Sequence, residues 1–299
     1  MQIRLLEYFV ALAAERHFAR AAAACNVSQP TLSGGLAALE EQLGRRLVER
    51  DRRFIGLTPE GLSVLPWAQQ LVAGFQALTL AATSAREPLC GTLRLGAIPA
   101  AAPSLGILAE MIARAHPGID LDIRSRTSRE IARDLAEFEL DAGVTYLDHE
   151  PPAHVTSVPL YRERAMFVAA EGFQHAQSGA VSWAEVMTLP LCLLHQGMQN
   201  RRILDEQLAR RGLAIRPRAT ADSFVALLAM ARSGAFATIM PDSYAALLPR
   251  WAKMLPFDEP AQLSQIGLVV PDRSPLSPLA AAALSVAERL ELPQEFGRA

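Results

Sequence analysis

The sequence predicts an α/β fold with a winged helix-turn-helix at the N-terminus, a long linker helix, and a C-terminal part in which strands and helices alternate. Three observations support this prediction. A tight turn separates two helical patterns before residue 44, one long helical pattern follows residue 58, and strand-like and helix-like patterns alternate from residue 92 onward. The 299 residues, 51% of them hydrophobic, suffice for two or three compact units with buried cores.

The helix-turn-helix centres on Ser28. An apolar helical pattern at 18–25 stops at Asn26, and a second pattern starts within a few residues. Ser28 is suited to cap the second helix, Pro30 occupies its first turn, where a missing N–H costs nothing, and Gly44 suits its C-terminal end. Two helices joined this closely cross steeply, and the start of the second one can then face the major groove of DNA. The apolar positions of the second helix are Leu32, Leu36, Leu39 and Leu43.

The segments that flank these two helices complete the N-terminal unit. Residues 3–16 repeat apolar side chains with a helical period, and we expect them to pack under the two helices. Residues 45–50 and 54–57 predict a short hairpin with three charged residues at its tip. Two interpretations of this hairpin remain open: a wing whose arginines contact phosphates, or a solvated charged turn. The arginines concerned are Arg50, Arg52 and Arg53.

A long helix is expected after Thr58, because Thr58, Pro59 and Glu60 supply a cap, a first-turn proline and a first-turn acid. Apolar residues then recur at spacings of three and four, which predicts one exposed apolar seam. A second subunit would cover this seam and fix the separation of two recognition helices, whereas packing onto the same domain is the alternative. We expect the helix to end in a hinge at 86–91. The seam consists of Leu62, Leu65, Ala68, Val72, Phe75, Leu78 and Ala82.

From residue 92 onward the pattern predicts a parallel sheet with right-handed crossovers. The first set comprises strands at 92–97, 119–124 and 142–146 and helices at 103–115 and 128–138. The second set, within 162–264, comprises strands at 166–170, 191–194, 215–220 and 237–240 and helices at 200–211 and 223–232. A strand at 266–270 and a final helix after Ser277 are expected to return the chain to the first set.

The composition narrows the possible functions. The formal net charge of -2 does not by itself indicate a nucleic-acid partner, yet residues 1–58 carry eight arginines against six acidic residues. Because this local excess of positive charge is small, binding to DNA would be stronger if a second copy of the chain doubled the number of phosphate contacts. No apolar run approaches the ~20 residues of a membrane span and no signal-peptide core is present, so we expect a cytoplasmic protein without a membrane partner. The histidines fall in no metal-binding spacing and no catalytic or phosphate-binding motif appears, so the sequence favours a non-enzyme without metal or cofactor.

Six blocks of residues follow one another between positions 6 and 61. They are LEYFVALA at 6–13, FARAA at 18–22, SQPTLS at 28–33, LEEQLG at 39–44, LVER at 47–50 and LTPEG at 57–61. In this order they resemble the N-terminal domain of LysR-type transcriptional regulators, and the rest of the chain resembles the effector domain of that family more loosely.

The resemblance implies a DNA-binding transcriptional regulator controlled by a small-molecule effector. The expected partners are double-stranded promoter DNA, RNA polymerase and further copies of the chain in a homodimer or homotetramer. The resemblance also implies an effector domain of periplasmic-binding-protein architecture, made of two lobes. The implied domains are 1–58, 59–91 and 92–299, with one lobe at about 92–161 and 265–299 and the other at about 162–264.

The candidate DNA-binding residues lie in the second helix and the wing. Gln29, Thr31 and Ser33 are small polar residues able to contact base edges or phosphates. Gly34 and Gly35 depart from the common family pattern of long polar or basic side chains. Either recognition relies on close backbone approach and DNA shape, or both glycines face solvent. The predicted residues are Ser28, Gln29, Pro30, Thr31, Ser33, Gly34, Arg50, Arg52 and Arg53.

The candidate effector site follows from a general rule. In open parallel sheets, ligands gather at the C-terminal strand ends, next to helix N-termini that favour anions. Arg201 and Arg202 open a helix, where positive charge opposes the dipole unless an anion compensates it. Either a small carboxylate or inorganic oxyanion binds there, or both arginines face solvent. Two interpretations of Thr127 and Ser128 remain open: contact with a ligand, or a plain helix cap. The predicted residues are Pro99, Ala100, Ala101, Thr127, Ser128, Thr145, Tyr146, Met198, Gln199, Asn200, Arg201, Arg202, Asp222, Ser223 and Phe224.

The N-terminal domain resembles in particular that of the peroxide-sensing OxyR regulators, which use a reactive cysteine in the second lobe. The corresponding stretch of this chain, 194–200, contains no thiol. Cys192 falls in an apolar strand pattern, where burial raises the pKa of a thiol and lowers its reactivity. Thiol-based peroxide sensing is therefore the less favoured alternative, and we expect Cys25, Cys90 and Cys192 to be buried or unreactive.

Overall fold

The computed structural model describes residues 2–50, 54–84, 88–173, 176, 179–293 and 296, with the backbone alone for Arg50. The chain divides into two compact units, one up to Leu89 and one from Cys90 onward. Helices and strands occur in both units, which confirms the predicted α/β class. The tip of the predicted wing and part of the predicted hinge lie outside the described residues. Within the described ranges, no helix combines the length and apolar character that a membrane crossing requires.

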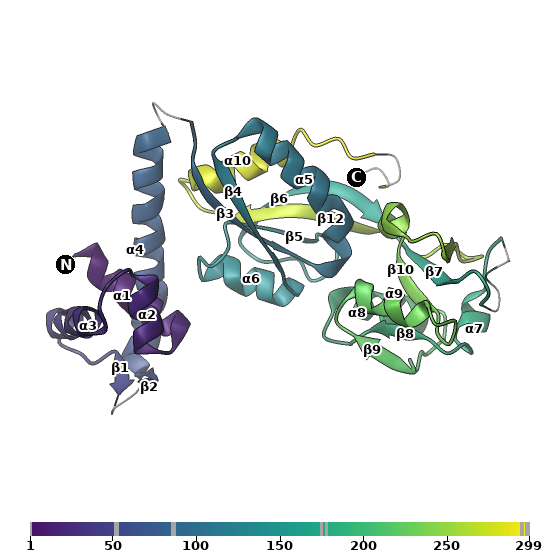
Figure 1. The fold of residues 1–299 in the computed structure, drawn as a ribbon, viewed down its shortest axis with the longest axis horizontal. Coiled ribbons are helices and arrows are strands. Elements are labelled where there is room, and N and C mark those ends of the chain that lie inside the picture. The colour runs from purple at the N-terminus through teal and green to yellow at the C-terminus, as the bar shows by residue number, and fades with distance from the viewer. Residues whose placement is uncertain are drawn as a thin grey trace. The chain divides into compact units, whose positions relative to one another are not determined.

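The N-terminal unit packs three helices and a hairpin against the first half of a long helix (Figure 1). The elements are α1 (Ile3–Glu15), α2 (Phe18–Ala24), α3 (Gln29–Leu43), the antiparallel strands β1 (Val48–Arg50) and β2 (Phe54–Leu57), and α4 (Pro59–Ser84). The helix-turn-helix, the hairpin and the long helix are thus present as predicted. Their shared core contains Leu6, Phe9, Leu12, Leu32, Leu36, Leu39, Ala68 and Val72.

The ends of α3 and the start of α4 are capped as the sequence predicts. Ser28 Oγ accepts a hydrogen bond from the Thr31 N–H at 3.3 Å, and Gly44 ends α3 in the left-handed conformation with φ 66°. Thr58 Oγ1 accepts from the Gly61 N–H at 2.9 Å and so caps α4. Of the four apolar positions of α3, Leu32, Leu36 and Leu39 are buried and Leu43 is 40% exposed. Leu43 is the last residue of the helix, beyond the part that α1 covers.

The predicted seam of α4 divides into two faces. Ala68 and Val72 are buried against the N-terminal unit itself, so the packing alternative holds for these two positions. A second stripe stays exposed, and its spacing of four, four and three residues places it along one side of the helix. The sequence analysis named only part of this stripe, since Trp67 and Leu71 were not among the predicted positions. The exposed stripe consists of Trp67, Leu71, Phe75 and Leu78.

The first lobe of the C-terminal unit is a five-stranded sheet with the order β4-β3-β5-β12-β6. Its strands are β3 (Gly91–Ala97), β4 (Ile119–Ser125), β5 (Ala142–Tyr146), β6 (Val155–Glu163) and β12 (Ser264–Pro271). The short helix η1 (Pro99–Ala101) leads into α5 (Ala102–Ala115), which covers one face with α10 (Pro278–Ala287), while α6 (Ser128–Ala136) covers the other (Figure 1). β3, β4 and β5 are parallel as predicted, but β12 is antiparallel to both of its neighbours, and the sequence analysis missed β6.

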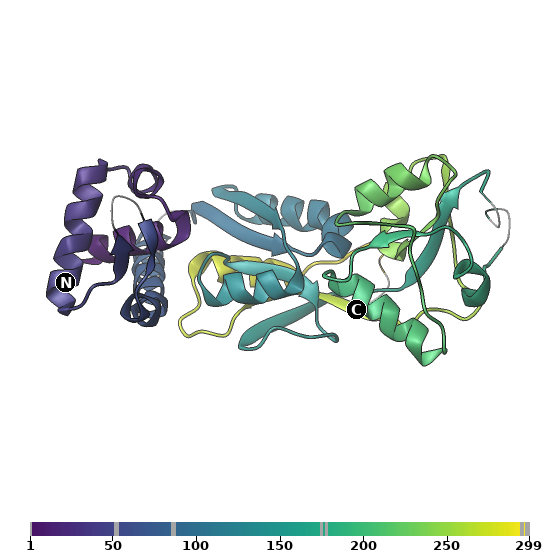
Figure 2. The same cartoon turned by 90° about the horizontal axis from the view of Figure 1, so that it is seen from below.

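The second lobe lies beside the first within the C-terminal unit (Figures 1 and 2). β7 (Ala165–Ala170) pairs with β10 (Thr238–Pro241) and β11 (Ala252–Leu255), β8 (Cys192–Leu194) pairs with β9 (Ala219–Ala221), and a bridge between Leu191 and Ala237 links the two sets. The helices are α7 (Trp183–Val186), α8 (Gln199–Arg210), α9 (Phe224–Ala231) and η2 (Asp242–Leu247). β9 is shorter than the strand predicted at 215–220, and the sequence analysis missed β11, α7 and η2.

The two adjacent glycines of α3 have different surroundings. A Cβ atom at Gly35 would lie 2.5 Å from Cδ2 of Tyr8, whose ring is buried between α1 and α3, whereas a Cβ at Gly34 would meet nothing within 4 Å. Gly35 therefore allows the close approach of α3 to α1. The interpretation that both glycines face solvent was wrong for Gly35.

This difference gives a stability prediction. Gly34→Ala should raise the free energy of unfolding by about 0.5–1 kcal/mol, because alanine restricts the unfolded chain and favours the helix. Gly35→Ala should lower it by roughly 1–3 kcal/mol, because the new methyl group overlaps the Tyr8 ring. Urea unfolding followed by helical circular dichroism measures both values. Equal effects at the two positions would contradict the assignment.

Candidate DNA-binding face and interlobe cleft

The start of α3 presents polar groups to solvent. Ser28, Gln29, Pro30 and Thr31 are exposed and Ser33 is half-buried. The Ser28 and Thr31 hydroxyls lie 2.8 Å apart and share a hydrogen bond, so part of their capacity is already used within the helix cap. Gln29 is therefore the long exposed side chain at this end of α3. Gly34 is exposed beside it.

The wing is only partly described. β1 and β2 form the predicted antiparallel hairpin, in which Arg50 pairs with Phe54. Arg52 and Arg53 lie outside the described residues, and for Arg50 only the backbone is described. The base of the hairpin is fixed to α3, because Glu40 Oε1 accepts hydrogen bonds from the N–H groups of Leu47 at 2.9 Å and Val48 at 3.2 Å. The position of the hairpin is thus set by the same helix that carries Gln29.

A cavity of about 230 Å³, partly open to solvent, lies between the two lobes of the C-terminal unit. It is lined from the first lobe by the ends of β3 and β5 and the start of α6, and from the second lobe by the end of β8 and the start of α8. These are strand ends and helix N-termini, the positions that the general rule selects. Eight predicted residues are brought together here: Pro99, Ala100, Thr127, Ser128, Tyr146, Met198, Gln199 and Asn200. Ile98 and Leu194 complete the lining.

Thr127 and Ser128 have different roles at the start of α6. Thr127 caps the helix, because its Oγ1 accepts from the Glu130 N–H at 3.3 Å. The Glu130 carboxylate in turn accepts from the Thr127 N–H at 2.8 Å and from its hydroxyl at 2.9 Å, and these bonds lower the pKa of Glu130. Ser128 is buried, and its hydroxyl donates across the cleft to Gln199 Oε1. Of the two hydroxyls, Ser128 is the one that reaches the second lobe.

Hydrogen bonds cross the cleft at several points. The Gln199 amide, besides accepting from Ser128, donates to the backbone oxygen of His149. Asn200 Nδ2 donates to the Tyr146 hydroxyl at 2.8 Å, and the Tyr244 hydroxyl donates to the Pro99 carbonyl at 2.6 Å. The polar side chains of the cleft are thus bonded to one another, and the two lobes are held together.

The two arginines at the start of α8 are both paired within the protein. Arg201 is buried, with Nε 2.8 Å from Asp205 Oδ1 and Nη1 donating to the Leu194 carbonyl at 3.1 Å. Arg202 lies 2.7 Å from Glu150 of the first lobe and donates to the Gly197 carbonyl at 2.8 Å. The hydrogen bond and charge of Arg202 lower the pKa of Glu150. Neither arginine lines the cavity, and the interpretation that both face solvent was wrong for Arg201.

The remaining predicted effector residues lie outside the lining. Ala101 and Thr145 are buried in the first lobe. Ser223 caps α9 by accepting from the Ala226 N–H at 3.4 Å, and Asp222 is exposed. Phe224 is buried, with its ring centroid 4.8 Å from that of Tyr244. Phe224 therefore supports a tyrosine that bonds the other lobe.

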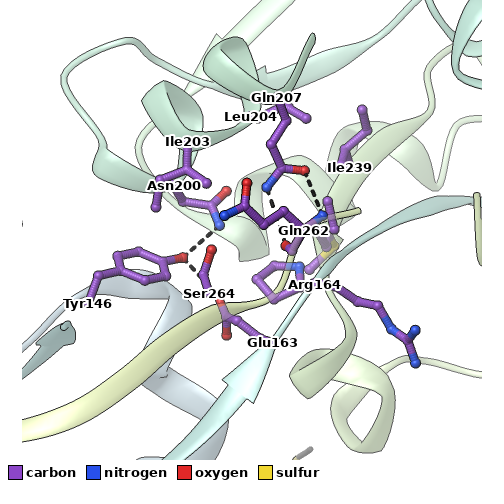
Figure 3. A pocket seen from close by; sticks show the side chains of 13 residues that line it. Tyr146, Glu163, Arg164, Asn200, Ile203, Leu204, Gln207, Ile239, Gln262 and Ser264 are labelled. Atoms are coloured by element: carbon purple, nitrogen blue, oxygen red, sulfur yellow. Dashed lines mark hydrogen bonds between the residues drawn. The ribbon is translucent and has the colours of Figure 1, made fainter. Parts of the chain in front are cut away.

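A second cavity, of about 340 Å³ and partly open to solvent, lies where the chain passes from the first lobe to the second (Figure 3). It shares Tyr146 and Asn200 with the cleft. Glu163, at the end of β6, is 2% exposed; the Tyr146 hydroxyl donates to its Oε1 at 2.7 Å and the Ser243 hydroxyl lies 3.1 Å from its Oε2. Burial raises the pKa of Glu163 to about 8. The sequence analysis missed Glu163, because nothing in its local pattern distinguishes a buried acid.

The three cysteines differ in exposure. Cys192 is buried, with Sγ 3.5 Å from the Ala237 carbonyl, and burial raises the pKa of its thiol to about 11. Cys25 is half-buried and its thiol pKa is raised by burial, whereas Cys90 is exposed. A thiol with a raised pKa is a weak nucleophile at neutral pH. Within the described residues, no group of three His, Cys, Asp or Glu side chains could hold a metal ion.

Comparisons with known proteins define the class as bacterial regulatory proteins. Residues 3–62 match the family described as "Bacterial regulatory helix-turn-helix protein, lysR family", and residues 86–290 match the "LysR substrate binding domain". The chain therefore belongs to the LysR family of transcriptional regulators, as the six sequence blocks predict.

The chain is also similar to individual members of this family. It is 40% identical over 193 residues to a "Probable hydrogen peroxide-inducible genes activator" of Mycobacterium avium, a match that covers 64% of this chain and 62% of that protein. A full-length OxyR cysteine-to-aspartate variant of Pseudomonas aeruginosa superimposes with a TM-score of 0.77 at 25% identity, over 97% of this chain and 99% of the other. CbnR in complex with its target DNA gives a TM-score of 0.69 at 22% identity, with the same coverage. At 22% identity, the comparison with CbnR shows only that the two proteins share a fold.

The raised pKa of Glu163 predicts a pH-dependent stability. Between the ordinary pKa of 4.5 and about 8, the folded protein keeps a proton that the unfolded chain has released. The free energy of unfolding should therefore fall as pH rises through this window, by about 1.4 kcal/mol per pH unit from this group, and level off above it. Glu163→Gln, which keeps both hydrogen bonds, should remove this slope. Urea unfolding at pH 5, 6.5 and 8 measures it, and parallel curves for both proteins would contradict the prediction.

Proposed function

We propose that the protein is a DNA-binding transcriptional regulator that acts as a homodimer or homotetramer and responds to a small molecule bound between the lobes of its C-terminal unit. The observation that carries the proposal is the capped helix α3, whose polar N-terminus is exposed on a compact helix-turn-helix unit with a hairpin beside it. Membership of the LysR family supports it. The proposed partners are promoter DNA and RNA polymerase, and the proposed site of action is the cytoplasm. We propose binding rather than catalysis as its activity.

Substitution of Gln29 tests whether the start of α3 contacts DNA. Gln29→Ala should weaken binding to DNA from upstream of the protein's own gene by roughly 10-fold, since a side chain that bonds a base edge contributes about 1–3 kcal/mol. Gln42→Ala is the matched control, because Gln42 is an exposed glutamine at the other end of α3. Fluorescence anisotropy at one fixed salt concentration measures both affinities. An equal loss in the two variants, or no DNA binding by the unchanged protein, would overturn the proposal.

The exposed stripe of α4 supports self-association. Four large apolar side chains lie exposed along one side of this helix, and Trp67 is 67% exposed. A contiguous apolar stripe of this kind marks an interaction surface, and a parallel or antiparallel copy of the same helix is complementary to it. Two copies of α4 would bring two N-terminal units together, which doubles the number of phosphate contacts.

Substitution in the stripe tests this part of the proposal. Leu71→Glu should shift the protein from a dimer or tetramer towards a monomer, because a carboxylate would be buried in the apolar interface without a partner. Gln76→Glu introduces the same charge at an exposed position on the opposite side of α4 and should leave the mass unchanged. Light scattering coupled to size exclusion measures the mass. A wild-type monomer would refute the proposed interface.

The effector is proposed to bind in the interlobe cleft, between the start of α6 and the start of α8. A small carboxylate or oxyanion would reach the charged edge of this cleft by displacing Glu150, which stands 2.7 Å from Arg202 and 3.5 Å from Arg129. Displacement would break one of the contacts between the lobes. The resulting change in lobe closure is the proposed signal, and in an assembled regulator it would alter the spacing of DNA-binding units and the bending of DNA.

A response to hydrogen peroxide is the alternative that the names of the relatives suggest. In this chain, no thiol occurs at 194–200, and the buried Cys192 has a raised pKa. A peroxide response would therefore need another group, such as the exposed Cys90. Repeating the DNA-binding assay after treatment with hydrogen peroxide, with a Cys90→Ser variant alongside, separates this alternative from the anion proposal.

A further inference from the structure

The cavity at the lobe crossing is built from both lobes and is largely separate from the interlobe cleft. Its base is the crossing segment from Glu163 to Ala165, one wall is α8 from Asn200 to Gln207, and the other walls are the end of β10 and the segment that returns the chain to β12 (Figure 3). The hydrogen bond from Asn200 to Tyr146 lies between this cavity and the cleft. The crossing cavity can therefore hold a ligand of its own.

Two residues with ionisable side chains line this cavity, Glu163 and Arg164, and among the described residues Glu163 has no basic partner. Glu163 bonds two hydroxyls, those of Tyr146 and Ser243. The neighbouring Arg164 belongs to the lining as well, but its charge is paired elsewhere, because its Nε lies 3.3 Å from Asp242. Asp148 and Asp242 add negative charge near Glu163 and raise its pKa, although burial is the larger cause. An anion would be repelled here, whereas a cation would supply the missing partner.

The other lining groups suit an ammonium group. An ammonium ion has three N–H donors and needs three acceptors. Glu163, Asn200 and Ser264, whose side chains contain acceptor oxygens, all belong to the lining. Ile203, Leu204 and Ile239 supply an apolar surface for a short hydrocarbon chain. The combination of one buried acid, polar acceptors and an apolar wall is typical of sites for small amines.

We propose that the cavity at the lobe crossing binds a small primary ammonium compound, whose charged group pairs with Glu163. This ligand is distinct from the effector proposed for the interlobe cleft. Glu163 and Tyr146 belong to the first lobe, and Asn200 and Ser243 to the second, so the bound ammonium compound stabilises the closed arrangement of the two lobes.

The proposal predicts that binding of the ammonium compound is linked to the release of a proton from Glu163. The empty site holds Glu163 in the protonated form below pH 8, and a cation favours the ionised form, so binding releases the proton to the solvent. The ammonium probe itself stays protonated throughout this range, because alkyl amines have a pKa near that of lysine. The association constant should therefore rise about tenfold for each pH unit between 6 and 7 and become constant above about 8.5.

The experiment is calorimetric titration of the full-length protein with ethylammonium chloride at pH 6, 7 and 8, in buffers of different ionisation enthalpy. We expect binding with release of about one proton at pH 6 and 7, and a higher melting temperature in the presence of the probe. Glu163→Gln should weaken binding at least tenfold and abolish proton release. Glu206→Gln, an exposed acid on α8, is the control and should bind as the unchanged protein does.

Three results would overturn the proposal: no binding of ethylammonium, equal binding by Glu163→Gln, or binding of sodium acetate at this cavity instead. If Glu163→Gln fails to fold, proton release by the unchanged protein decides the question. DNA binding by the same preparation separates this inference from the proposed function. Intact DNA binding without ammonium binding refutes only the inference, and ammonium binding without DNA binding refutes only the proposed regulator.

Discussion

A chain of buried hydrogen bonds joins the two lobes of the C-terminal unit and fixes most of what the site can do. It runs from Asn200 to the Tyr146 hydroxyl, on to the Glu163 carboxyl, and ends at Ser243. Tyr146, Glu163 and Ser243 are buried and Asn200 is half-buried, and a buried polar group without a partner is costly. The two lobes therefore lie close enough for each of the four side chains to have a hydrogen-bond partner. Tyr146 is the central member, and burial raises its pKa well above 10, so its hydroxyl stays protonated and can donate to Glu163.

This arrangement separates the interlobe cleft from the crossing cavity. The Tyr146–Asn200 bond lies across the space between the lobes, so the strand ends and helix starts line one cavity and the crossing segment lines the other. The electrostatic character of the two cavities differs as a result. Arg129, next to the cleft-lining Ser128 in the chain, and Arg202, at the start of α8, both pair with Glu150, whereas the lining of the crossing cavity includes the buried acid Glu163.

Features set by neighbouring residues were predictable from the sequence, and features set by distant residues were not. The caps at Ser28 and Thr58 and the left-handed Gly44 depend on a few adjacent residues, and the structure has them where the sequence places them. β6 was missed because, in the part of the chain that the structure describes, it pairs with β12 alone, about a hundred positions away. The bond between Ser128 and Gln199 likewise joins residues 71 positions apart. Arg201 is an intermediate case: its partner Asp205 is four residues on, a helical spacing that was visible in the sequence.

The mutual bonding of Ser128, Gln199 and the His149 carbonyl has an energetic consequence for any molecule that enters the cleft. Such a molecule competes with the Gln199 amide, which is already hydrogen-bonded to Ser128 and to the His149 carbonyl. Its apparent affinity is therefore its intrinsic affinity multiplied by the fraction of protein molecules in which the cleft is free. The two bonds of Gln199 therefore raise the concentration at which such a molecule fills the cleft. A shorter side chain at position 199 would remove both of these bonds and with them the competition that an entering molecule meets.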